Sequence, residues 1–311
     1  MTSPVILLGP HRHEPILDEV LRDRGLQGPF ALVTAGWQER EQEDEELREA
    51  LGGAEAVNLR LYQRFDELME DDRELAVATH ERQEALREIQ DLYRIRLGGM
   101  VGAARDLMAR VGHDELLAPE RRSAIEMVRQ LDRHHTARVE EVHRRYEQAM
   151  RLDERQGLMR HRAEVAQAIQ DARALFIAGG HVAVLLNRMM LFGLAEQARQ
   201  RPVVAWAAGA MAVAERVVLF HDSPPEGAGH AEVLGRGLGL CRGVLPLPHA
   251  HRRLKLDDPL RVALLSQRFV EMRPVCLDRR SRIDWDPPRW TPSPGTQALG
   301  ADGAVTLWEA A

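Results

Sequence analysis

The pattern of apolar runs along the chain changes twice, and these changes constrain the fold more than any other feature. Within residues 4–62, the apolar runs "PVILLG", "FALVTAG" and "AVNLRLY" are separated by the helical stretches "EPILDEVLRDRG" and "EREQEDEELREALGG". Strands separated by single helices predict a mostly parallel, doubly wound α/β sheet. From residue 63 to about 172 the strand pattern is absent, and it resumes with "ALFIAGG". We therefore expect one α/β domain, formed by residues 1–62 and 173–311, with a large α-helical insertion.

The expected insertion, residues 63–172, has the spacing of long helices. Apolar side chains recur at steps of three and four from Leu86 to Val111, and again from Val128 to Ala149. This spacing places each set on one face of a helix, which needs a packing partner. We expect a helical hairpin or bundle that packs on itself or pairs with a second copy of the chain, and a homodimer is the favoured assembly.

Three polar residues of the insertion are candidates for chemistry. Glu140 and His143 form a Glu-x-x-His pair of the kind found in di-iron bundles, but such a site needs a second pair and two further glutamates on facing helices. His135 lies in the second apolar set, where a polar residue more often fixes the register of packed helices. We interpret all three as structural.

The stretch "RPVVAWAAGAMAVAE", residues 201–215, predicts a buried strand that enters a helix through a turn of small residues. Many α/β hydrolases present their nucleophile at such a turn, in the pattern Gly-x-Ser-x-Gly. The central position here is Ala207, which has no atom that can attack a carbonyl. The local structure of a nucleophile elbow is therefore predicted without its nucleophile.

Composition excludes several classes of protein. The chain has 311 residues with a formal net charge of −6, which argues against a nucleic-acid binder. Its two cysteines, Cys241 and Cys276, do not make a disulfide framework, and we expect ordinary core thiols. No apolar run is long enough for a signal peptide or a membrane span. We expect a cytoplasmic protein that uses no cofactor and binds neither nucleic acid nor membrane.

Three segments together resemble the cyanophycinase and aspartyl dipeptidase group of serine peptidases. "ALFIAGGHVAVLL" is similar to that family's strand ending in Gly-Gly, and "VVAWAAGAM" is similar to its "G-T-S-A-G-A" elbow. "LGRGLGLCRGVLPLPHAHRRLKLDDPLRVALL" resembles the stretch that carries its catalytic histidine, and "LGADGAVTLW" its closing hairpin. The resemblance implies a class I glutamine amidotransferase-like, flavodoxin-like fold for residues 4–62 and 173–308. Residues 63–172 have no counterpart in the family's pattern.

The resemblance also implies site residues. Ala207 stands where the family has its serine, and His249 falls at the catalytic histidine and is expected to be a relic of the base. Arg252 and Arg253 match the basic residues that follow and are expected to bind an acidic ligand through forked hydrogen bonds or to form a solvated pair. The backbone N–H groups of Ala208 and Gly209 open a helix and are expected to remain an anion site.

Further candidates follow from the predicted sheet, because ligands bind at the carboxyl ends of parallel strands. Gly179, Gly180 and His181 follow one strand, although His181 also suits the first turn of a helix. His11 and His13 follow the first strand, but His-x-His without a third ligand is weak evidence for a metal. We expect an ordinary polar loop there and no metal site.

Three hypotheses follow. The first is a catalytically inactive pseudoenzyme that binds a small acidic ligand or peptide end, or a protein partner through the helical insertion. The second is an active hydrolase or amidotransferase-like enzyme with a nucleophile outside the elbow, for example Ser223 in "FHDSPPEG". The third is a purely structural protein that dimerises through residues 63–172.

Overall fold

The computed structural model describes residues 3–11, 14–221 and 229–309, and its largest sheet is a mixed one with a parallel centre. Five neighbouring strands run parallel, and two antiparallel strands extend the sheet at one edge. In spatial order the strands are β11 (Arg289–Pro292), β10 (Arg282–Asp286), β1 (Val5–Leu8), β5 (Val203–Trp206), β4 (Ala174–Ile177), β2 (Phe30–Val33) and β3 (Ala56–Asn58). The expected α/β class with a mostly parallel sheet is confirmed.

Both faces of this sheet are covered, which explains why its strands are continuous apolar runs. All four residues of β1, β2, β4 and β5 are buried. Alternate residues point to opposite faces. Ile6 and Leu8 pack in one core with α1 (Leu17–Arg24) and α2 (Glu45–Ala50), whereas Val5 and Leu7 belong to the other core. That second core includes side chains of α7 (Val182–Leu191) and α9 (Ala208–Val213). Helices therefore lie on both faces, as predicted.

A second sheet lies beside the first and was only partly anticipated. Its strands, in spatial order, are β13 (Val305–Leu307), β12 (Gln297–Leu299), β9 (Arg273–Leu277) and β8 (Val244–Pro248). β8 and β9 are parallel and are connected through α10 (Ala250–Arg253) and α11 (Pro259–Arg268). The predicted strand "GVLPLPH" and the closing hairpin are present as β8 and as β12 with β13.

Two apolar runs each form one helix and one strand. "AGAMAVAERVVLF" forms α9 and then β6 (Arg216–Leu219), which pairs with β7 (Glu232–Arg236). "AVNLRLY" forms β3 and then the first turn of α3 (Leu61–Asp71). Apolar periodicity alone does not locate such junctions, because short buried strands and short buried helices have the same composition.

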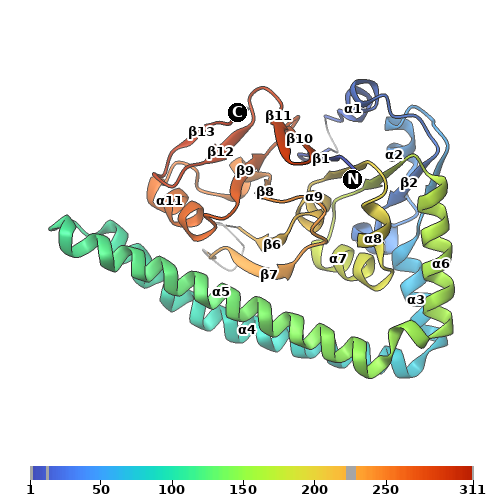
Figure 1. Cartoon of the computed structure of the whole chain (residues 1–311), viewed down its shortest axis with the longest axis horizontal. Helices are drawn as coiled ribbons and strands as arrows, with labels where there is room; N and C mark the ends of the chain where they lie inside the picture. Colours follow the sequence, from blue (N-terminus) through green and yellow to red (C-terminus); the bar gives the residue numbers. More distant parts are fainter. Residues whose placement is uncertain (1–2, 12–13, 222–228, 310–311) are drawn as a thin grey trace.

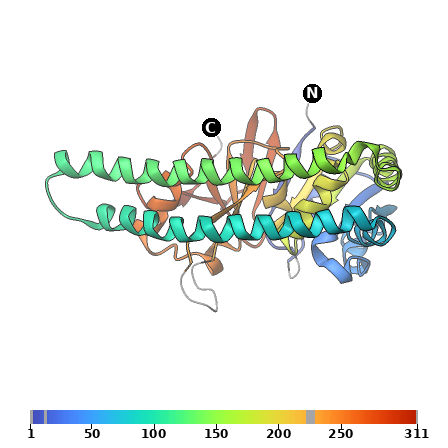
Figure 2. The ribbon, with the colours of Figure 1, turned by 90° about the horizontal axis from the view of Figure 1, so that it is seen from below.

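The predicted long helices are present as an antiparallel hairpin of α4 (Arg73–Ala109) and α5 (Asp114–Met150). Figures 1 and 2 show the two helices side by side along one side of the α/β part, with α3 and α6 (Gln156–Asp171) at their base. Tyr93, Leu97 and Ala104 are buried as the spacing predicts, but Val111, beyond the end of α4, is 97% exposed. The division of the chain into an α/β domain and a separate insertion stays a prediction.

A buried polar network attaches the hairpin to the second sheet region. Arg268 of α11 donates to both carboxylate oxygens of Asp132 at 2.7 Å and to the hydroxyl of Tyr93 at 2.7 Å. The hydroxyl of Tyr93 donates to Asp132 at 2.8 Å and accepts from the backbone N–H of Val233 in β7. His135 stacks on Tyr93 with ring centroids 4.0 Å apart, so it serves packing, as we inferred.

Candidate functional site

The turn between β5 and α9 has the backbone geometry of a nucleophile elbow. Ala207 has φ 50° and ψ −119°, a conformation that residues with a Cβ rarely adopt and that costs of order 1–3 kcal/mol. The neighbouring strand helps to hold it, because the Ala207 N–H donates to the carbonyl oxygen of Leu8 at 3.2 Å. The strained turn is thus present with a methyl group at the position where a hydrolase has its nucleophile.

Glycines allow three backbone segments to meet beneath this turn. A Cβ on Gly179 would lie 2.9 Å from the Cβ of Ala207, and a Cβ on Gly180 would lie 2.2 Å from the carbonyl oxygen of Gly36. The N–H of His181 donates to that same carbonyl oxygen at 2.7 Å. The predicted Gly-Gly pair therefore brings the ends of β2, β4 and β5 together, which a larger residue would prevent.

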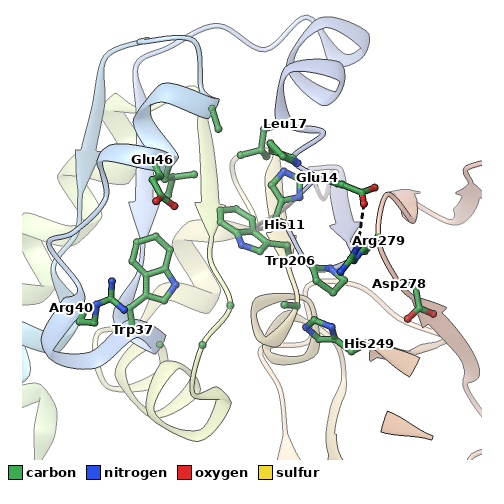
Figure 3. A pocket seen from close by; sticks show the side chains of 18 of the residues that line it. His11, Glu14, Leu17, Trp37, Arg40, Glu46, Trp206, His249, Asp278 and Arg279 are labelled. Carbon is green, nitrogen blue, oxygen red and sulfur yellow. Dashed lines mark hydrogen bonds and ion pairs between the residues drawn. The ribbon is translucent and has the colours of Figure 1, made fainter. Parts of the chain in front are cut away.

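A cavity of about 1180 Å³ opens over the elbow, where the carboxyl ends of strands from both sheets converge. Figure 3 shows its side chains: Trp37, Arg40 and Glu46 on one side, His249, Asp278 and Arg279 on the other, and Trp206 with His11 between them. Its described lining residues are Pro10, His11, Glu14, Pro15, Leu17, Gly36, Trp37, Arg40, Glu43, Glu45, Glu46, Leu47, Ala50, Gly179, Gly180, Trp206, Ala207, His249, His251, Arg252, Asp278 and Arg279.

The two walls of the cavity differ in charge. The wall formed around α2 carries Glu43, Glu45 and Glu46, of which Glu43 is paired with Arg40. The opposite wall follows β8 and β9 and carries His249, His251, Arg252 and Arg279 together with Asp278. A ligand in the cavity therefore meets carboxylates on one side and mainly basic groups on the other.

Two of the predicted residues on the basic wall lie in the cavity as expected. His249 follows β8 with φ 58°, and burial, followed by the positive charges of Arg253 and Arg252, lowers its pKa. It is therefore neutral at pH 7, the form in which an imidazole accepts a proton. Arg252 is exposed and, among the residues with a described position, forms no ion pair and no side-chain hydrogen bond.

His11 lies in the cavity as a fixed, neutral ring. Its Nε2 accepts a hydrogen bond from the N–H of Ile16 at 3.1 Å, and its ring centroid lies 5.6 Å from that of Trp206. Burial lowers the pKa of His11 to about 4, although the charge of Asp18 acts against this. The expected role as an ordinary loop residue fits these contacts, and His13 lies outside the described residues.

Four of the predicted ligand-binding residues do not line the cavity. His181 is the N-cap of α7 and accepts from the N–H of Val184 at 3.3 Å, the alternative role that we considered. Ala208 is buried, and a Cβ on Gly209 would lie 2.4 Å from the carbonyl oxygen of Ile177, so Gly209 serves close packing of α9 on β4. Arg253 is not part of the lining, and burial, together with the charge of Arg252, lowers its pKa.

Sequence reasoning missed a histidine–carboxylate pair in the cavity. Nδ1 of His251 lies 2.6 Å from Oδ2 of Asp278, and the backbone N–H of His251 donates to Oδ1 of the same residue. The signals were the second histidine of "HAHRR" and the position of Asp278 directly after the apolar run "PVCL". Arg279, the next residue, pairs with Glu14 of the lining at 3.3 Å.

The described lining of the cavity contains no serine, threonine or cysteine. Cys241 and Cys276 are buried elsewhere, and burial raises the pKa of both thiols, that of Cys276 to about 12. Both are therefore protonated at neutral pH, as core thiols are. Ser223 lies outside the described residues.

Among the described residues, no group of three or more His, Cys, Asp or Glu side chains could hold a metal ion. Glu140 of the Glu-x-x-His pair forms an ion pair with Arg236 of β7 instead. Within the same described ranges, no helix is long and apolar enough to cross a membrane.

Comparison with known proteins gives similarity to solved structures but no match of sequence. No protein-family model matches this sequence, and no curated protein matches it. The fold is similar to the crystal structure of a peptidase from an acI-B1 Actinobacterium, with a TM-score of 0.48 and 13% identity over 99% of this chain and 98% of that one.

Proposed function

We propose that this protein is a catalytically inactive relative of the cyanophycinase and aspartyl dipeptidase group, with a flavodoxin-like, class I glutamine amidotransferase-like fold. It binds a small acidic ligand or a peptide end in the cavity over Ala207. The observation that carries this proposal is the strained elbow, φ 50° and ψ −119°, occupied by alanine beside a large cavity. Conformational strain is retained where the surrounding structure holds it, and such positions cluster at functional sites.

The chemistry of the cavity supports binding without acyl transfer. A serine peptidase forms an acyl-enzyme through its nucleophile, and loss of that group typically removes most of the rate enhancement. Arg252 supplies a guanidinium at the cavity wall that has no carboxylate partner among the described residues. An arginine of this kind binds a carboxylate in a forked geometry.

The proposal is tested by calorimetric titration with aspartyl dipeptides, together with a hydrolysis assay on the same peptides and on an aspartyl-arginine polymer. We expect binding without hydrolysis above background. Arg252→Gln should weaken binding at least about tenfold, because a charge-assisted forked hydrogen bond contributes about 1.5–3 kcal/mol. Arg160→Gln, a change of an exposed arginine on α6, is the matched control and should leave binding unchanged. Absence of binding by the unaltered protein would contradict the proposal.

The second candidate, an active hydrolase or amidotransferase-like enzyme with a nucleophile outside the elbow, is favoured by the His251–Asp278 pair. A carboxylate 2.6 Å from Nδ1 orients the ring, so that the other nitrogen can take a proton from water or another nucleophile. Hydrolysis that exceeds background several-fold and is abolished by His251→Ala or His249→Ala would establish this candidate and exclude the first.

We also propose that the helical hairpin contacts a protein partner, with a second copy of the chain as the favoured one. Val77, Leu92 and Ile95 are 52%, 56% and 75% exposed, and at 100° per residue they lie within about 60° of one face of α4. Sedimentation analysis of the full chain tests this. We expect a dimer that Ile95→Asp dissociates, whereas a monomer at high micromolar concentration would contradict it.

A further inference from the structure

Two half-buried arginines near the base of the hairpin have no hydrogen-bond or ion-pair partner among the described residues. Arg82 lies on α4 and Arg188 on α7, and the Nε atom of each is buried without a hydrogen-bond partner. Among the residues with described positions, neither side chain donates a hydrogen bond or forms an ion pair. A guanidinium has five N–H donors, and buried donors are nearly always satisfied.

Aromatic rings hold both guanidinium groups in place. The guanidinium carbon of Arg188 lies 3.3 Å from the centroid of Phe65 and 5.5 Å from that of Tyr62, both on α3. The corresponding carbon of Arg82 lies 4.2 Å from the ring centroid of Tyr146 on α5. Stacking uses the face of a guanidinium and leaves its N–H edges available, so these contacts orient the two arginines without satisfying them.

Neither guanidinium is paired with a described carboxylate, although carboxylates act on both through space. Burial lowers the pKa of Arg188 to about 10, and the charge of Arg82 contributes to this shift. Burial lowers the pKa of Arg82 as well. His143, on α5, has its pKa lowered to about 4 by burial and by the charge of Arg82, so it is neutral near pH 7.

The carboxylates nearby form no ion pair with either arginine. Asp66 and Glu41 act on Arg188 through space, but neither lies within 4.0 Å of its nitrogens. Glu41 instead accepts hydrogen bonds from the backbone N–H groups of Tyr62 and Gln63 at the start of α3. Glu147 likewise acts on Arg82 only through space.

We propose that Arg82, Arg188 and His143 form a binding site for a small oxyanion, a phosphate or carboxylate group, where α3, α4, α5 and α7 meet. An oxyanion accepts forked hydrogen bonds from both guanidinium groups and compensates their charge. This site is separate from the cavity over Ala207, because none of its residues lines that cavity. It therefore does not depend on the function proposed for the elbow.

Inorganic phosphate is the probe, titrated into the full-length protein by calorimetry at constant ionic strength and pH 7. We expect saturable binding that Arg82→Gln and Arg188→Gln each weaken at least tenfold. Arg87→Gln, which alters an exposed arginine of α4 that pairs with Glu84, is the matched control and should leave binding unchanged. Arg252→Gln alters the elbow cavity and distinguishes an anion bound there from one bound at the proposed site.

A second measurement uses the unaltered protein and does not depend on how the variants fold. Phosphate should shift the ¹⁵N–¹H signals of two arginine Nε–H groups, which the two glutamine variants assign to Arg82 and Arg188. Absence of saturable binding at 20 mM phosphate overturns the proposal. So does binding that Arg252→Gln abolishes and Arg188→Gln leaves intact, because the anion would then occupy the elbow cavity.

Discussion

Two arginines of the α/β part of the molecule, Arg268 on α11 and Arg188 on α7, have different surroundings. Arg268 of α11 is 5% exposed, and it donates to Asp132, to Tyr93 and to the carbonyl oxygen of Ala231. Burial by itself lowers the pKa of Arg268, but the hydrogen bonds and charge of Asp132 outweigh it, and the pKa is raised. Arg188 of α7 stacks on Phe65, forms no such bonds with the described residues, and has a lowered pKa.

We interpret Arg268 as a structural link between α11 and the hairpin, and Arg188 as a residue that is available to a ligand. A buried guanidinium with a bidentate carboxylate partner fixes two elements relative to each other, and removal of one partner leaves an uncompensated charge. The half-buried guanidinium of Arg188 has no such partner among the described residues to lose. Ala207 is likewise a residue that the fold does not require. Its backbone is strained in the folded chain, and no described contact there requires an alanine.

The largest loss of stability is expected when Arg268 loses its carboxylate partner, Asp132. Asp132→Ala leaves Arg268 buried without its partner and should reduce the free energy of unfolding by about 3–5 kcal/mol, measured by urea titration. Glu84→Ala breaks an exposed ion pair on α4 and is the control, with an expected change below about 1 kcal/mol. An equal effect of the two substitutions would remove the contrast between buried and exposed pairs.

His143 should make the unpaired cluster sensitive to acid. Its pKa in the folded chain, about 4, lies below the unfolded value of about 6.5, so the unfolded chain takes up the proton first. Its contribution to stability is complete above pH 6.5 and is lost as the pH falls toward 4, by about 3 kcal/mol.

The measurement is the free energy of unfolding of the protein and of His143→Gln between pH 7 and pH 4. The variant should lose less stability over this range. His134→Gln, an exposed change on the same helix, should behave like the unaltered protein. Addition of phosphate should reduce the acid-dependent loss, because a bound anion raises the pKa of His143. Identical pH profiles for all three proteins would show that His143 is not desolvated.

The elbow provides a smaller test with the opposite sign. Ala207→Gly removes the Cβ from a residue at φ 50° and should stabilise the protein by about 1 kcal/mol, the relief of strain less the greater entropy of the unfolded chain. Ala210→Gly, within α9, should destabilise it by about 1 kcal/mol. Thermal unfolding of the two variants separates these effects. Destabilisation by Ala207→Gly would show that its methyl contact outweighs the strain.

The smallest change in the free energy of unfolding is expected on substitution of Arg188. Arg188→Met keeps an unbranched side chain against Phe65 and removes a charge without a described partner, so the free energy of unfolding should change by less than about 1 kcal/mol. If Arg188→Met lowered the free energy of unfolding as much as Asp132→Ala, the comparison would be contradicted, because Arg188 would then contribute to stability as much as Arg268.

Much of the site was predictable because the strands leave a local signature. Buried parallel strands are continuous apolar runs, and the residues that follow them lie at one edge of the sheet. This reasoning placed His11 and Gly179 at that edge, the elbow pattern placed Ala207, and the family resemblance placed His249; all four line the cavity. It failed for His181, whose capping of α7 depends on where its helix begins rather than on which strand it follows.

The rest of the site depends on contacts between distant segments. The acidic wall around α2, the Glu14–Arg279 pair and the His251–Asp278 pair join residues that no short motif connects. The same is true of Arg82 and Arg188, which are more than 100 positions apart in the sequence. Their proximity results from the path of α3, α4 and α7, and apolar periodicity predicts that helices exist without giving their relative placement.

The sequence by itself determined that this chain has a parallel α/β sheet, two long amphipathic helices and an elbow with alanine in place of a nucleophile. These are local properties, because side-chain periodicity and the identity of one residue are present in any short stretch of chain. Only the tertiary structure decided which charges have a partner. Arg268 has one, Arg188 has none among the described residues, and the cavity contains charges of both kinds. A charge is compensated by whatever lies within a few ångströms of it, and in a folded chain those neighbours come from segments far apart in the sequence.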